Sequence, residues 1–356
     1  MISTTQVQNG FCRTLVPMAL SSQCASAHAL LNAMQAVSAI HHTSSIAAAA
    51  QFKLKAVHNL TKSLTIDQCS TVPEASEIQL AAAMMLCVYD VFDKEEGSWH
   101  IHLRGAKDIV RRQRFVANQS LDSDFLLTWL LYHDVLAAFT QPSWGSASHQ
   151  AERDLLFLLQ GFGVDRTFIV GSLGCSVEVL EIIHWINGMR LTTTQHSESL
   201  MLQRCDLEAR LFNLRQELEP GEKSESLRSS RILATAELYR LAALLYLQRV
   251  CPSTTDDTTR VVYVQQAIRI LQSMEVATSP WPVFIVACEI PDEERVGLLR
   301  TLDHMDSVRS IGNTKVLRKV IEGIWKQYDL RSTSESCPKN DWLQFVDCEV
   351  PVPWFI

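Results

Sequence analysis

His100 and His102 form an H-x-H pair, a spacing that can place two imidazoles on one metal ion when the segment is a β-strand. The residues around them predict a helix instead, and on a helix side chains two positions apart point about 200° away from each other. Two such rings do not share a metal ion unaided, so separate packing or surface roles are favoured. The ten cysteines are scattered and form no C-x-x-C motif, which argues against a local zinc site or a disulfide framework.

Four acidic residues cluster at the end of an apolar stretch and could be read as a carboxylate site: Asp90, Asp93, Glu95 and Glu96. An acidic loop at a helix end is the commoner explanation, because no second acidic cluster is identifiable as a partner. The sequence also contains no G-x-S-x-G, H-E-x-x-H or Walker A motif. We therefore predict no catalytic residue, no bound cofactor and no metal ligand, and we do not expect an enzyme.

Five basic residues form the densest charged feature, a candidate contact patch made of Arg104, Lys107, Arg111, Arg112 and Arg114. Positions 104, 107 and 111 lie on one face of a helix, where they could touch phosphates or belong to a nuclear import signal. A solvated helix face explains them at least as well. The formal net charge of −7 and the lack of interleaved aromatic residues argue against a chain that grips nucleic acid by itself.

The elements that carry these residues are expected to be helices. Only 13 Gly and 11 Pro occur in 356 residues, and Leu and Ala recur at helical spacing. Helical patterns cover 26–64 with a break near 41–43, 73–92, 99–114, 122–139, 177–188, 226–249, 261–271 and 314–328. The predicted fold class is all-α, a large bundle-like domain of roughly a dozen helices with no significant β-sheet. The longest apolar run, Leu80–Tyr89, is too short to cross a membrane.

Five leucines between residues 200 and 218 follow one another at spacings of 7, 4, 3 and 4, and Pro220 closes the segment. Their spacing predicts a helix that continues to that proline. A short coiled coil for dimerisation would need about three to four heptads, and only about two and a half are present. Packing against other helices of the same chain is therefore favoured.

One stretch carries more than helical periodicity, because residues 81–113 read AAAMMLCVYDVFDKEEGSWHIHLRGAKDIVRRQ. It resembles the signature of the fungal-specific transcription factor domain, in which a small-apolar helix ends in a Tyr-Asp/Glu pair and a Trp-x-x-His-Leu-x-Gly-Ala motif follows. Segments at 125–138, 171–183, 237–246 and 281–285 are similar to that family's later patterns. The matching residues are Tyr89, Asp90, Trp99, His102, Leu103, Gly105 and Ala106, followed by Trp129, Asp134, Tyr239, Arg240, Trp281 and Pro282.

The resemblance covers about residues 20–346 and implies one helical regulatory domain over 20–356, after an N-terminal segment over 1–19. It implies a transcriptional regulator in the nucleus that works through other regulators, a homodimer partner or a small-molecule effector, without a membrane. Members usually carry an N-terminal binuclear zinc cluster whose six cysteines begin C-x-x-C-x6-C, and this sequence lacks that motif. DNA is then reached only indirectly, or through a cluster omitted by an incomplete gene model.

The motif residues are expected to be structural. Trp99, Leu103 and Trp129 are predicted to be core residues because each lies on an apolar helical face. The alternative to a regulator is a helical metabolite-binding protein or enzyme with an apolar pocket. Thermal shifts of the pure protein with metabolites, set beside turnover assays, separate the two.

Overall fold

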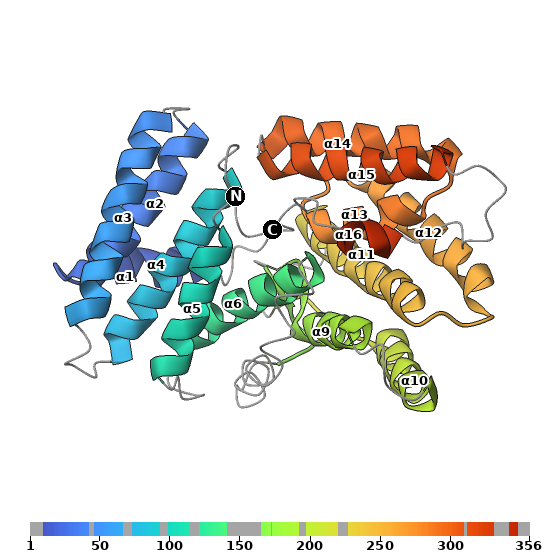
Figure 1. The fold of residues 1–356 in the computed structure, drawn as a ribbon, viewed down its shortest axis with the longest axis horizontal. Coiled ribbons are helices and arrows are strands. Elements are labelled where there is room, and N and C mark those ends of the chain that lie inside the picture. Colours follow the sequence, from blue (N-terminus) through green and yellow to red (C-terminus); the bar gives the residue numbers. More distant parts are fainter. Residues whose placement is uncertain are drawn as a thin grey trace. The chain divides into compact units, whose positions relative to one another are not determined.

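The computed structural model describes residues 10–42, 46–66, 73–92, 99–113, 121–140, 165–171, 173–191, 197–219, 227–309, 312–330 and 342–347. These residues are helical apart from one two-stranded sheet and short connections, so the predicted all-α class is confirmed (Figure 1). The backbone contacts divide them into two compact units, with unit 1 ending at Asp134 and unit 2 beginning at Val135. A single domain over 20–356 stays a prediction.

Unit 1 is built on one buried helix, α4 (Pro73–Phe92), which packs with α2 (Ala25–His42), α3 (Ile46–Ile66) and α5 (Trp99–Gln113). Every residue of α4 from Ile78 to Val91 is buried. The cause is the long apolar run in the sequence, since a helix that is apolar all round must be covered on every side.

Three of the first described residues, Thr14, Leu15 and Ala19, are buried in unit 1. They lie in the π-helical turn η1 (Phe11–Leu15) and α1 (Val16–Leu20). The Phe11 ring lies edge-on to Trp129 of α6 (Leu121–Thr140), with the ring centroids 5.0 Å apart. The predicted N-terminal segment over 1–19 therefore contributes side chains that pack against a later helix.

Unit 2 has α11 (Leu227–Val250) as its central helix, with α9, α12 and α13 packed against it. Before α11 come β1 (Ile169–Val170), β2 (Cys175–Ser176), α9 (Val177–Leu191) and α10 (Ser197–Asn213). After it come α12 (Asp256–Ser273), α13 (Pro280–Glu289), η3 (Asp292–Glu294), α14 (Arg295–Arg309), α15 (Gly312–Leu330) and α16 (Trp342–Asp347).

Helix α13 is an element that the helical patterns did not predict. It begins with Pro280 and holds a second proline, Pro282, in its first turn. Proline is tolerated there because the first backbone N–H groups of a helix have no partner within the helix. All ten residues of α13 are buried, so tertiary packing completes a helix whose sequence begins like a turn.

The predicted leucine helix ends early, and its prediction as far as Pro220 is wrong. Helix α10 stops at Asn213, and the following residues pair with the segment before β1. Glu217 donates its N–H to the Thr167 carbonyl and accepts from the Ile169 N–H, both at 2.9 Å. Leu218 then packs against the buried cluster of Ile169, Ile232 and Ala236, where a longer helix would not place it.

Gly174 turns the chain between β1 and β2, which pair antiparallel with Ile169 opposite Ser176. Its φ of +79° lies in the left-handed region, where a side chain is strained. A methyl group at this position would also lie 3.0 Å from Thr235 Cγ2. A close approach to α11 and a left-handed backbone therefore both require glycine here.

Candidate functional site

The Tyr-Asp and Trp-x-x-His motifs meet at a buried carboxylate in unit 1. Asp90 lies near the end of α4 with its side chain fully buried. Lys53 of α3 places Nζ 2.7 Å from Asp90 Oδ1, and His102 of α5 places Nε2 3.6 Å from Oδ2. The Lys53 ammonium also lies 4.9 Å from the centroid of the Tyr89 ring. One carboxylate thus joins α3, α4 and α5, and the acidic-loop interpretation is wrong for Asp90.

Burial sets the charge of His102. Desolvation lowers its pKa below the ordinary value, and the neighbouring Asp90 charge offsets only part of that effect. The imidazole is therefore neutral at neutral pH, which leaves Lys53 as the cation that balances Asp90. The other members of the acidic cluster, Asp93, Glu95 and Glu96, lie outside the described residues.

The H-x-H pair is split between two environments. His102 faces Asp90, while the His100 ring lies edge-on to Trp99 with the centroids 5.9 Å apart. Within the described parts of the chain, no group of three His, Cys, Asp or Glu side chains is arranged to hold a metal ion. The absence of structural zinc stays a prediction.

The apolar motif residues of unit 1 are in the core, as predicted. Trp99, Leu103 and Trp129 have exposed fractions of 9%, 5% and 2%, and Ala106 is fully buried. Gly105 is different, because a methyl group placed on it would meet no atom within 4 Å. Neither packing nor backbone conformation therefore requires glycine at this motif position.

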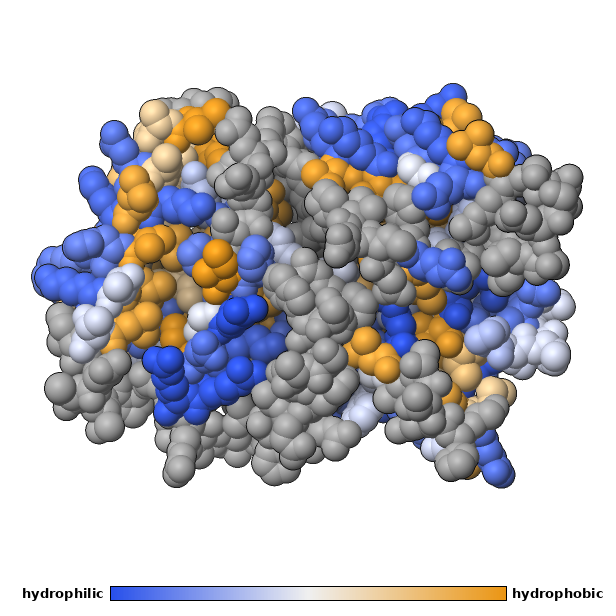
Figure 2. Space-filling model, viewed as in Figure 1, coloured by the Kyte–Doolittle hydropathy of each residue, from blue (hydrophilic) through white to orange (hydrophobic). Residues whose placement is uncertain are grey.

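The basic patch on α5 is smaller in the structure than in the sequence. Lys107 places Nζ 2.6 Å from Oδ1 of the motif residue Asp134, so this lysine holds α5 to α6 inside unit 1. Arg104, Arg111 and Arg112 are exposed, and hydrophilic side chains gather over α5 in Figure 2. Arg114 lies outside the described residues.

The later motifs come together in unit 2, where α11 meets α13. The Tyr239 ring stacks on the Trp281 ring at a centroid distance of 5.9 Å, and Pro282 follows in the first turn of α13. Arg240 makes two hydrogen bonds to Glu237 and a third to the Leu211 carbonyl. No described residue accepts a hydrogen bond from the buried Trp281 N–H.

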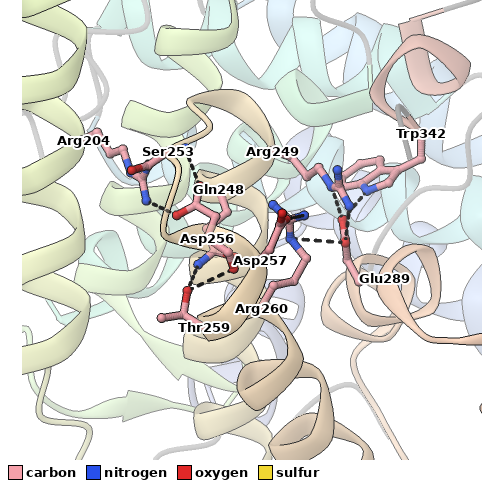
Figure 3. Close-up of polar contacts among 10 residues, drawn as sticks. All are labelled: Arg204, Gln248, Arg249, Ser253, Asp256, Asp257, Thr259, Arg260, Glu289 and Trp342. Carbon is pink, nitrogen blue, oxygen red and sulfur yellow. Dashed lines mark hydrogen bonds and ion pairs between the residues drawn. The ribbon is translucent and has the colours of Figure 1, made fainter. Parts of the chain in front are cut away.

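A second buried carboxylate, Glu289 at the end of α13, was missed by the sequence analysis (Figure 3). Arg249 of α11 donates two hydrogen bonds of 2.6 Å to its two oxygens. Trp342 of α16 donates a third from its indole N–H, also at 2.6 Å, and Arg260 of α12 lies 3.7 Å away. In the sequence, Arg249 and Glu289 each stand at the end of an apolar helix. That position does not indicate which residue each of them pairs with.

Electrostatics favour the charged form of Arg249. Desolvation lowers the pKa of Arg249, but hydrogen bonds and charge from Glu289 outweigh it, and the pKa is raised overall. Figure 3 also shows Arg204 of α10 reaching Asp256 of α12, at 2.5 Å. These pairs tie four helices and α16 together through groups that balance one another.

Comparison with known proteins identifies a family. A family model described as the fungal specific transcription factor domain matches residues 1–355. "Transcription factor iacI" of Pestalotiopsis fici is 25% identical over 327 residues, which is 89% of this chain and 81% of that protein. No solved structure matches the chain. No described helix is long and apolar enough to span a membrane. The resemblance first seen in residues 81–113 thus extends over nearly the whole sequence, and the chain belongs to the fungal specific transcription factor domain family.

Proposed function

We propose that this chain regulates transcription in the nucleus through contacts that its helical units make with other proteins, a second copy of itself or a small effector. The family match over residues 1–355 carries the proposal. The name of the Pestalotiopsis fici relative, a transcription factor, supports it.

DNA reading is assigned to another segment or protein. These 356 residues contain no C-x-x-C motif, so they supply no binuclear zinc cluster, and their formal net charge is −7. Lys107 of α5 forms an ion pair with Asp134 and so does not add to the exposed basic surface of that helix. A few exposed arginines give weak, salt-sensitive attraction to phosphates but no base-reading element.

A non-enzymatic role is part of the proposal. The two buried carboxylates, Asp90 and Glu289, are each matched by cations from neighbouring helices. Groups held in this way stabilise a scaffold, whereas a general acid or base needs a pKa near the working pH and access to a substrate.

The test is to tether the chain to a separate DNA-binding module and to measure transcription of a reporter that carries the module's site. We expect a change, up or down, relative to the module alone at equal abundance. Gly105→Ala, which alters no contact, should keep the effect, and Glu289→Gln, which disrupts a buried network, should reduce it. A reporter that does not respond to the tethered chain would contradict the proposal.

The assignment of DNA reading has its own test. The purified chain is mixed with a randomised DNA library at about 150 mM salt, near physiological ionic strength. We expect no enriched sequence. Recovery of a motif by this chain alone would overturn that part of the proposal and leave the tethering result intact.

A further inference from the structure

Three aromatic side chains and one carboxylate of unit 2 contact Trp342. We name these four residues the Trp342 site: Phe139, Tyr246, Phe284 and Glu289. The Trp342 side chain is fully buried, and its ring centroid lies 5.8 Å from that of Phe284, 6.3 Å from Phe139 and 6.4 Å from Tyr246. Its indole N–H donates a 2.6 Å hydrogen bond to Glu289 Oε1 (Figure 3). The site therefore packs against a bicyclic ring and accepts a hydrogen bond from one N–H group. A free indole molecule has both features.

The Trp342 site is supported by contacts that do not involve Trp342. Arg249 holds both oxygens of Glu289. The Phe139 ring lies edge-on to Tyr246 and to Phe284, at centroid distances of 5.1 Å and 6.0 Å. The Tyr246 hydroxyl donates to Asn187 Oδ1 at 2.8 Å. Removing Trp342 therefore leaves these residues with their own partners.

Helix α16, which supplies Trp342, is short. It has six residues, far fewer than the roughly 12–15 that an isolated helix needs for even marginal stability. Among its described side chains only Trp342 and Val346 are buried, and Gln344 is exposed. Trp342, with an exposed fraction of 0%, is the most enclosed of its described side chains.

We propose that the Trp342 site binds small indoles, flat bicyclic aromatic compounds with one ring N–H donor, and that the ligand displaces Trp342 and releases α16. The inference rests on the proposed function, since release of α16 would be the signal by which this regulator reports a small effector. Full enclosure of the Trp342 ring favours a small molecule over a larger partner. The tethered tryptophan competes with an effective concentration of the order of millimolar, so the free ligand must be supplied at that level.

The test titrates indole and 1-methylindole into the full chain and into Trp342→Phe by calorimetry. The phenylalanine fills part of the site but has no N–H, so we expect indole to bind this variant roughly 10- to 100-fold more tightly than wild type. 1-Methylindole, which cannot donate to Glu289, should bind Trp342→Phe at least about tenfold more weakly than indole. Amide exchange of residues 342–347 in Trp342→Phe should rise when indole is added.

The matched control is Trp129→Phe, which changes a buried indole of unit 1 whose ring packs on Phe11, Phe125 and His133. This variant should bind indole as wild type does. Equal indole affinity in wild type and Trp342→Phe, equal affinity for the two ligands, or unchanged exchange at 342–347 would overturn the proposal. Trp342 would then be a core residue only. The tethered reporter needs no indole, so failure here is distinguishable from failure of the proposed function.

Discussion

Asp90 in unit 1 and Glu289 in unit 2 are both carboxylates with fully buried side chains, but the two units balance them differently. Asp90 is matched by Lys53, whose side chain is 24% exposed, and by a neutral His102. Glu289 is matched by two hydrogen bonds from Arg249, whose side chain is 13% exposed, and by Trp342. The Lys53 ammonium makes one contact to Asp90 from a flexible stem, whereas the planar Arg249 guanidinium holds both oxygens of Glu289.

Burial of a carboxylate does not by itself determine how much its charge contributes to stability. The cost of removing that charge depends on whether the partner cation can move into solvent. In unit 1 the partner enters from the surface, so the ion pair is separable. In unit 2 the partners come from α11 and α16 and lie mostly inside the fold. Removing the carboxylate charge there should lower the free energy of unfolding strongly.

The greatest loss of stability is expected from one of two isosteric changes. Glu289→Gln should cost more than Asp90→Asn. Glu289→Gln removes the negative charge that Arg249 and Trp342 contact and should lower the free energy of unfolding of unit 2 by about 3–5 kcal/mol. Asp90→Asn should cost unit 1 only about 1 kcal/mol, because Lys53 moves into water. Urea unfolding followed by hydrogen exchange in α4 and α13 measures each unit separately. Equal losses in the two units would contradict the different structural weights of Asp90 and Glu289.

Acid should act with opposite sign on His133 in unit 1 and on Glu181 in unit 2. Burial lowers the pKa of His133 in unit 1 from its ordinary 6.5 to about 3, so below pH 6.5 the unfolded state takes up the proton first. Through His133, the free energy of unfolding of unit 1 should therefore fall by about 2 kcal/mol between pH 8 and pH 5. Desolvation raises the pKa of Glu181 in unit 2, so protonation there favours the folded state as the pH falls.

The measurement is the stability of each unit at pH 8 and pH 5, in wild type and in His133→Gln. The variant has no titrating group at this position, so the His133 share of the acid loss should disappear from unit 1. An unchanged pH dependence in the variant would show that His133 does not cause it.

The two units also differ in what their glycines do, and Gly174→Ala in unit 2 should be destabilising. The left-handed backbone alone costs a residue with a side chain about 1–2 kcal/mol, and the new methyl group also presses on Thr235. Thermal unfolding of the variant checks this. A melting temperature equal to that of wild type would mean that the turn between β1 and β2 can adopt another conformation.

The smallest effect is expected at Gly105 in unit 1, with the opposite sign. Gly105→Ala adds a methyl group in open space inside a helix, so it should stabilise by about 0.5–1 kcal/mol. The same thermal experiment applies. A loss of stability would mean that an unseen contact needs this surface, and loss of reporter activity in a stable variant would place a partner on α5.

Local sequence was sufficient for most helices of both units, because their signals lie within a few residues. Pro73 begins α4, the break near 41–43 separates α2 from α3, and α5 begins at Trp99 as predicted. The burial of Trp99 and Trp129 also follows from helical periodicity, which needs only the identity of residues one turn away.

Tertiary structure alone decided the rest. Glu289 meets Arg249 across 40 residues and Trp342 across 53, and no periodicity carries information over such distances. The pairing of Glu217 with Thr167 likewise overrode a helical leucine spacing. Helical pattern determines which face of a helix is apolar, but the partner of a buried charge depends on which helices pack together, and that is settled only when the whole core forms.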